Sequence, residues 1–188
     1  MFCPAGSERT LSQFALVSYL PDPLAQFLDQ LRLDLTPRCN PRAHVTVLPP
    51  RPLTAEICEA VECLAEEARS SPPFRIDLGE ICIFPVSNVI YVSLASGERE
   101  IHALYENLNC GQLEYDGPFP FHPHITIAQD FDAAKVAELA DVARRRWAAW
   151  DGPRSFPVDS LSFVQNVAPG AWVDVARIPL AVPVGASR

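Results

Sequence analysis

The pattern of hydrophobic and polar positions along this chain changes repeatedly between two periods, and each period predicts a different kind of element. Short alternating or continuous apolar runs indicate strands, whereas apolar residues spaced three and four apart indicate amphipathic helices. Clusters of Pro, Gly, Ser and Asp separate these segments, as turn-forming residues do. In chain order the pattern predicts a strand at 14–20, a helix at 23–35, a strand at 43–48, a helix at 54–69, strands at 74–84 and 89–94, a helix at 101–108, a strand at 121–129, a helix at 132–150, and strands at 153–164 and 172–180.

Several of these boundaries depend on particular residues. Asp22 is expected to be the N-cap of the first helix, with Pro23 as its first helical residue. Thr54 is expected to cap the second helix through its hydroxyl group. The pair Pro49-Pro50 is expected to end the strand before it, because proline has no N–H to donate to a sheet ladder.

The order of the elements predicts an α+β fold. Both halves of the chain run through strands and helices in a similar order, and each contains one segment of the pattern His-apolar-Thr-apolar. We therefore expect two pseudo-symmetric, interleaved lobes around a central cleft, each a small, mainly antiparallel sheet backed by helices. A length of 188 residues suits a single domain over residues 1–188, in which 1–12 and 181–188 are expected to be flexible tails.

Composition narrows the class of protein further. A hydrophobic content of 48% predicts a globular core, and no apolar stretch reaches the roughly 20 residues of a membrane span. The N-terminus lacks the pattern of a secretory signal, and the six cysteines form no Cys-x-x-Cys pair, so we expect a cytoplasmic protein with reduced thiols. A net charge of −8 argues against binding along a long nucleic acid, but it is compatible with a small nucleotide or an RNA end. We expect a monomer.

The two His-apolar-Thr-apolar segments carry the candidate chemistry. Side chains alternate along a strand, so His44 and Thr46 share one face, and His124 and Thr126 share another. Two imidazoles could take and give a proton near neutral pH, as the opening of a cyclic phosphate requires. The threonine hydroxyls could donate to phosphate oxygens as negative charge develops on them. This set of residues suits phosphodiester chemistry without a metal.

The paired motifs, and the run at 121–126 that contains the second, resemble the 2H phosphoesterase superfamily, in particular its bacterial 2′-5′ RNA ligase-like branch. The resemblance covers the chain from about residue 14 to residue 180. It implies a bilobal fold whose central cleft holds His44 and His124 as catalytic residues and Thr46 and Thr126 on the phosphate. It also implies hydrolysis of 2′,3′-cyclic phosphates of nucleotides or RNA ends to 2′-phosphates, weak 2′-5′ RNA ligation in some members, and neither metal nor cofactor.

Five further residues are candidates for contact with the substrate. The arginine among them could reach a phosphate, with a solvated strand end as the alternative. The three aromatic residues could stack on a base, with packing in the core as the alternative. The histidine could lie at the edge of the cleft or have a structural role. These candidates are Arg42, Phe84, Tyr91, Phe119 and His122.

Two alternatives from other functional classes remain at this point. A binding module would hold a nucleotide or an RNA end in the same cleft without turnover. A zinc-dependent hydrolase would use His44, His122 and His124 as nitrogen ligands, although this would leave the threonines without a role. Several substrates present the same phosphate to the motif residues: a cyclic mononucleotide, an RNA end, a cyclic ADP-ribose phosphate and an oligoadenylate.

Overall fold

The computed structural model describes residues 13–37 and 39–181. Strands and helices occur in the predicted order, with two short 3₁₀ helices and one additional strand. The elements are β1 (Gln13–Tyr19), α1 (Leu24–Leu35), β2 (His44–Pro52), α2 (Ile57–Ala68), β3 (Phe74–Ile83), β4 (Ile90–Ser96), α3 (Glu98–Leu108), η1 (Gly111–Leu113), β5 (Ile125–Ala128), η2 (Ala133–Lys135), α4 (Val136–Ala149), β6 (Ser155–Val158), β7 (Ser160–Ala168) and β8 (Ala171–Pro179).

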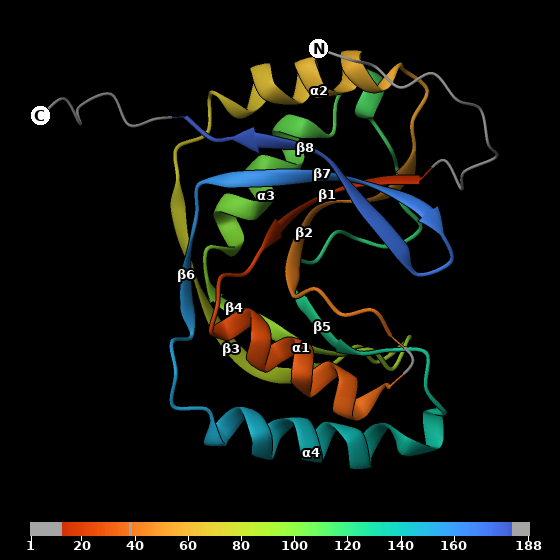
Figure 1. Cartoon of the computed structure of the whole chain (residues 1–188), viewed down its shortest axis with the longest axis vertical. Helices are drawn as coiled ribbons and strands as arrows, with labels where there is room; N and C mark the ends of the chain where they lie inside the picture. The colour runs from red at the N-terminus through yellow and green to blue at the C-terminus, as the bar shows by residue number, and fades with distance from the viewer. Residues whose placement is uncertain (1–12, 38, 182–188) are drawn as a thin grey trace, which may run out of the picture.

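The strands form two four-stranded antiparallel sheets, which lie one above the other in Figure 1. The first sheet has the order β2-β1-β7-β8 and the second the order β5-β4-β3-β6. The two motif strands, β2 and β5, occupy corresponding edges of the sheets and contact each other. The predicted α+β fold with two sheet-based lobes is therefore confirmed.

Two helices pack across the boundary between the sheets. α1 follows β1 of the first sheet in the chain, but it packs against β5 of the second sheet and against α4 (Figure 1). α3 follows β4 of the second sheet and packs against β2 of the first sheet and against α2. Each motif strand is thus supported by a helix that comes from the other half of the fold.

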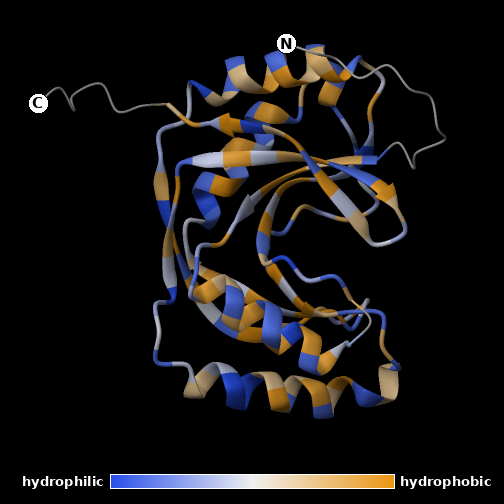
Figure 2. Ribbon diagram, viewed as in Figure 1, coloured by the Kyte–Doolittle hydropathy of each residue, from blue (hydrophilic) through white to orange (hydrophobic). Residues whose placement is uncertain are grey.

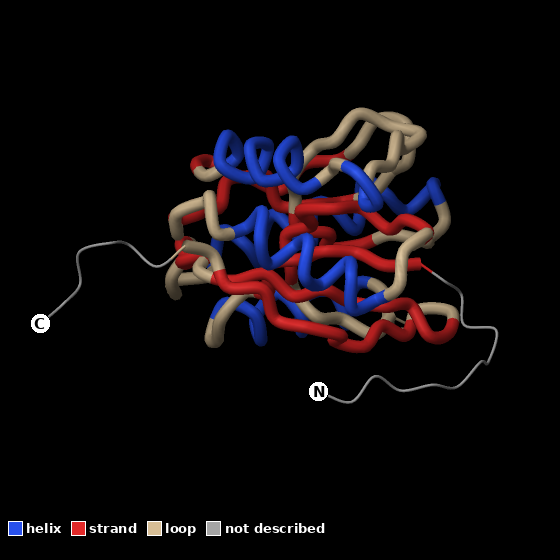
Figure 3. The backbone as a smooth tube through the Cα atoms, turned by 90° about the horizontal axis from the view of Figure 1, so that it is seen from above, coloured by secondary structure: helices blue, strands red, loops and turns tan. Residues whose placement is uncertain are grey.

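One cluster of buried apolar side chains extends through both sheets and their helices. Leu16 of β1 and Ile76 of β3 belong to this cluster and are fully buried. Hydrophobic and hydrophilic residues alternate along the helices (Figure 2), as expected for helices that bury one face. Seen from above, the strands run alongside one another among the helices (Figure 3). Among the described residues, no helix combines the length and the apolar character that crossing a membrane requires.

The predicted strand 153–164 is wrong in one respect, because the structure divides it between the two sheets. β6 pairs with β3 in the second sheet, whereas β7 pairs with β1 and β8 in the first. The break falls at Asp159, whose carbonyl accepts a hydrogen bond from the N–H of Leu180 at 2.9 Å. The buried positions change phase at this crossover, from 156 and 158 before it to 161 and 163 after it. The two consecutive polar residues Asp159 and Ser160 mark the change of partner in the sequence.

Two strand boundaries also differ from the prediction. β2 continues past Pro49-Pro50 to Pro52, which the fold permits because β2 is an edge strand with one side unpaired. β5 begins at Ile125 rather than at residue 121, so the segment around Pro123 leads into the strand without belonging to its ladder.

The predicted helix caps are wrong as well. The side chain of Asp22 accepts a hydrogen bond from Gln26 Nε2 at 2.9 Å and makes no capping bond to α1. α2 begins at Ile57 after Glu56, which places Thr54 outside the cap position. The flexible tails predicted at 1–12 and 181–188 lie outside the described residues except for Ala181, whose N–H donates to the Ser71 carbonyl at 2.9 Å.

Candidate functional site

Both motifs show the predicted alternation of side chains. The apolar residues of the two motifs are between 0% and 1% exposed, so they point into the core. His44, Thr46, His124 and Thr126 are each partly exposed. The histidine and the threonine of each motif therefore lie on the face opposite the core.

The two imidazoles are oriented by the same local contact. His44 Nδ1 lies 2.6 Å from the carbonyl oxygen of Arg42, and His124 Nδ1 lies 2.7 Å from that of His122. A carbonyl oxygen only accepts, so Nδ1 carries the proton in both rings and the neutral rings keep their lone pair on Nε2. The two motifs thus present the same proton-accepting nitrogen.

The pKa of each motif histidine is lowered, first of all by burial. The hydrogen bonds to the two carbonyls act in the opposite direction. The positive charges of Arg32, Arg42 and a protonated His124 lower the pKa of His44 further. The influence of His124 on His44 shows that the fold brings the two imidazoles, 80 positions apart in the chain, into one electrostatic environment.

Three of the predicted substrate-contact residues surround His124. The rings of Phe84 and Tyr91 are stacked, with centroids 4.1 Å apart, and His124 meets both of them edge-on at 4.9 and 5.4 Å. His122 meets the same two rings edge-on at 5.3 and 5.6 Å. Tyr91 is only 8% exposed, whereas Phe84 is partly exposed. His124 therefore has an aromatic wall on one side, and Phe84 offers part of that wall to solvent.

Phe119 is not brought into this aromatic group. It is 73% exposed in the loop before β5, and no ring contact among the described residues includes it. A role for Phe119 at the site therefore depends on contact with a substrate.

Arg42 is engaged by neighbouring residues of the first sheet. Its Nη1 donates to both carboxylate oxygens of Asp174, at 2.8 and 2.9 Å, and its guanidinium lies 3.4 Å from the centre of the Tyr19 ring. Tyr19 also donates its hydroxyl to Asp174 at 2.8 Å, and burial raises the pKa of this phenol. Because the carbonyl of Arg42 orients His44, this cluster holds the first motif in place.

Sequence reasoning missed Arg32, which α1 carries to the second motif. Its Nη1 donates to the carbonyl oxygen of Thr126 at 3.4 Å, and its charge lowers the pKa of His44. No sequence signal identifies this residue, because the packing of α1 on the opposite sheet places it there.

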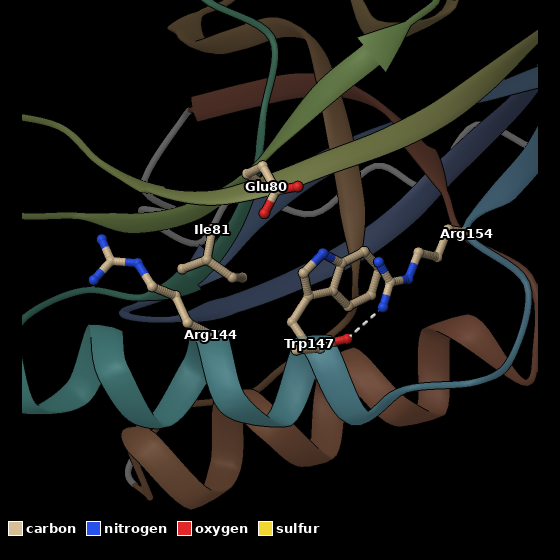
Figure 4. A pocket seen from close by; sticks show the side chains of 6 residues that line it. Glu80, Ile81, Arg144, Trp147 and Arg154 are labelled. Carbon is tan, nitrogen blue, oxygen red and sulfur yellow. Dashed lines mark hydrogen bonds between the residues drawn. The ribbon is translucent and has the colours of Figure 1, made fainter.

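The described residues do not assemble a metal site of three or more His, Cys, Asp or Glu side chains. The zinc alternative requires His44, His122 and His124 to converge on one point, and this arrangement is not found among them. A hollow of about 260 Å³ lies elsewhere, between β3 and α4 (Figure 4). Glu80, Arg144 and Trp147 line it, and none of the motif residues does.

A two-lobed α+β fold that presents a His-x-Thr strand from each sheet defines the class of 2H phosphoesterases. The chain belongs to the 2′-5′ RNA ligase superfamily, whose family model matches residues 20–169. A relative from Bacillus pumilus, inferred to be a phosphoesterase, is 39% identical over 131 residues, which cover 69% of this chain and 74% of that protein.

Solved structures show the same fold at lower identity. Escherichia coli LigT complexed with 3′-AMP is 19% identical, with a TM-score of 0.62, over 90% of this chain and 98% of LigT. TT0787 of Thermus thermophilus is 19% identical, with a TM-score of 0.63, over 89% of this chain and 97% of that chain. At this level of sequence identity, the similarity to these structures shows a shared fold.

Proposed function

We propose that this protein hydrolyses 2′,3′-cyclic phosphates of nucleotides or RNA ends to 2′-phosphates without a metal. The observation that carries the proposal is the matched orientation of His44 and His124, each held through Nδ1 with Nε2 as its proton-accepting nitrogen. Family membership supports phosphoester chemistry, and the threonine beside each imidazole supplies a hydroxyl donor.

In this reaction one neutral imidazole takes a proton from water, and the water oxygen forms a bond to phosphorus. The bond between phosphorus and the 3′ oxygen breaks, and the other, protonated imidazole gives its proton to that oxygen. Thr46 and Thr126 donate their hydroxyls to the non-bridging oxygens, on which negative charge increases in the transition state. The product is a 2′-phosphate with a free 3′ hydroxyl.

The assignment of base and acid rests on two arguments that point in opposite directions. The family resemblance favours His124 as the base and His44 as the acid, although the two motifs are too alike to decide it. The charges in the structure favour a neutral His44, because Arg32 and Arg42 both oppose its protonation. A cyclic substrate with sulfur at the leaving position needs no acid, so it should rescue the variant of whichever histidine is the acid.

We propose a small nucleotide or an RNA end as the substrate. The net charge of −8 gives little support to contacts with many phosphates, and the exposed part of Phe84 beside His124 suits stacking of a base. E. coli LigT, which shares the fold, has been crystallised with 3′-AMP, with ATP and with NADP+. Weak 2′-5′ ligation would use the same groups, with the 5′ hydroxyl of a second RNA end attacking phosphorus in place of water and the 3′ oxygen leaving as before.

The proposal is tested with a panel of 2′,3′-cyclic nucleotides and 2′-5′-linked oligonucleotides, with products identified by mass and phosphate position. We expect 2′-phosphates from the cyclic substrates. Binding without any product would favour the binding-module alternative. Turnover that disappears in excess chelator would favour the zinc alternative.

A further inference from the structure

Arg32 lies where the two motif strands meet. Its Nη1 reaches the carbonyl oxygen of Thr126, at 3.4 Å, from the helix that packs on β5. Among the charges that lower the pKa of His44, that of Arg32 contributes most. The guanidinium is therefore close to one residue of each motif.

The hydrogen bonding of Arg32 is incomplete. Its Nε is buried and has no partner among the described residues. No carboxylate of the described residues lies within 4.0 Å of its guanidinium nitrogens. Burial raises the pKa of Asp29, one helical turn earlier, and the nearby charge of Arg32 opposes this shift only in part. The buried Oδ1 of Asp29 also lacks a partner among the described residues. A planar, delocalised cation with donors still available is suited to an incoming oxyanion.

The other described arginines next to the first motif are already engaged. Arg42 is held by the carboxylate of Asp174 at 2.8 Å. Arg51 is buried and donates to the carbonyl of Leu113 at 2.6 Å and to the side chain of Asn109. Arg32 differs from both in having a buried guanidinium nitrogen, Nε, with no hydrogen-bond partner among the described residues.

We propose that Arg32 binds the phosphate group of the substrate and neutralises its charge between the two motif strands. The inference rests on the proposed function, because it takes the phosphate to lie between His44 and Thr126. It also gives the packing of α1 a role, since a helix from the first half of the chain delivers the cation to the second motif.

The first test measures binding of inorganic phosphate by calorimetry, which requires no turnover. Arg32→Gln should weaken this affinity by about 10-fold to 100-fold, the range expected for losing charge-assisted hydrogen bonds. Arg32→Lys should fall in between, because it keeps the charge and loses the planar fork. Arg145→Gln on α4 removes an exposed arginine away from the motifs, and its affinity for phosphate should equal that of the wild type.

The second test uses the pH profile of kcat/KM. If Arg32 had only a structural role, its replacement would not shift the limbs of this profile. Arg32→Gln removes a positive charge beside His44, so the limb that belongs to His44 should move to higher pH, whereas Arg32→Lys should keep it. Movement of the acidic limb would identify His44 as the base, and movement of the alkaline limb would identify it as the acid.

The other charged and titratable groups around His44 are unchanged in these variants, so a shift of the limb can be assigned to Arg32. They are His124 immediately before β5, Arg42 before β2 and Tyr19 on β1, together with Asp29 on α1 and Asp174 on β8, which both interact with Arg42.

Wild-type affinity for phosphate in Arg32→Gln, together with an unmoved limb, would overturn the inference. If Arg32→Gln does not fold, the wild-type protein provides the test through its arginine Nε–H signals in a ¹H–¹⁵N spectrum. The Arg32 signal, assigned by its absence from Arg32→Lys, should shift when inorganic phosphate is added, and a stationary signal would overturn the inference. Neither binding test depends on turnover, so the failure of the proposed reaction would be seen separately.

Discussion

At the scale of single residues, two backbone carbonyls orient the motif imidazoles. Each accepts from the Nδ1 of the histidine two positions later, at 2.6 Å for His44 and 2.7 Å for His124. The same contact in both motifs selects the same tautomer, which leaves Nε2 as the proton-accepting nitrogen of each neutral ring. The surroundings differ, with arginines near His44 and an aromatic wall beside His124. Two groups with the same backbone contact thus lie in different electrostatic surroundings.

Replacement of either motif histidine should remove proton transfer. His44→Ala and His124→Ala should each lower kcat at least about 100-fold, the range for losing a general acid or base. The double variant should lose far less than the product of the two factors, because both groups serve one step. His102→Ala on α3 is the matched control and should retain the wild-type rate in steady-state assays. Near-normal turnover in either single motif variant would refute the assignment.

The threonines should act in the transition state. Thr46→Val and Thr126→Val remove a hydroxyl and nearly preserve the shape of the side chain. Each should cost about 2–4 kcal/mol of transition-state stabilisation if the hydroxyl donates to the phosphate. The free energy follows from the ratio of kcat/KM values between wild type and variant. Unchanged ratios for both would make the threonines structural.

The pH dependence follows from the direction of the two pKa shifts. Burial lowers the pKa of both His44 and His124, so the imidazole that must begin protonated loses its proton below the usual range. We expect a bell-shaped profile of kcat/KM with its maximum on the acidic side of neutrality, and the two limbs belong to the coupled pair. A profile that is flat from acidic to alkaline pH would exclude the acid–base pair.

At the scale of elements, the start of α3 matters because this helix packs beneath the first motif strand. Gly97 lies between β4 and α3, at the N-cap of α3, with a φ of 85°, in the region that favours glycine. A Cβ added there would lie 2.7 Å from Ile76 Cγ1 and 2.8 Å from the carbonyl oxygen of Arg75. The second neighbour is backbone, so the contact cannot be relieved by a change of rotamer.

Gly97→Ala should therefore lower the free energy of unfolding by about 2–4 kcal/mol, through backbone strain and overpacking together. Gly170→Ala is the matched control, because Gly170 has a φ of 72° and nothing within 4 Å of an added Cβ. It should cost only the backbone term of about 1–2 kcal/mol. Denaturant unfolding of both variants compares the two values, and equal losses would contradict the steric argument.

At the scale of the whole molecule, the two sheets depend on each other for their helices. α1 and α3 each pack on a motif strand of the opposite sheet, so neither lobe is complete without the other. The first motif, the second motif and Arg32 are consequently parts of one arrangement. That the chain forms a single domain and acts as a cytoplasmic monomer stays a prediction from length and composition.

The proposed metal-independent reaction on a short substrate predicts how turnover by the intact protein responds to chelator and to salt. Excess chelator should leave turnover of a cyclic mononucleotide unchanged, and added zinc should not raise it. The logarithm of kcat/KM should fall only weakly with the logarithm of salt concentration, with a slope of about one, because few phosphates are neutralised. A slope of many units, measured on the same protein with RNA, would instead indicate contacts along a longer chain.

Many features of this fold follow from local sequence. Hydrophobic periodicity located the strands and helices, because side chains alternate along a strand and recur every turn of a helix. It did not separate β6 from β7, because the one-residue change of phase at Asp159 and Ser160 also occurs within a single strand at a β-bulge. The caps predicted at Asp22 and Thr54 were wrong, because other contacts and a later helix start removed them from those positions.

The sequence by itself determined the catalytic candidates, because His and Thr at alternate positions of a strand must share a face wherever that strand lies. Only the tertiary structure decided that β2 and β5 meet, that Arg42 is held by Asp174, and that Arg32 reaches the second motif. These contacts join residues more than ninety positions apart or cross from one sheet to the other. Local spacing carries no information about them, because they arise when helices and sheets bury their apolar faces against each other.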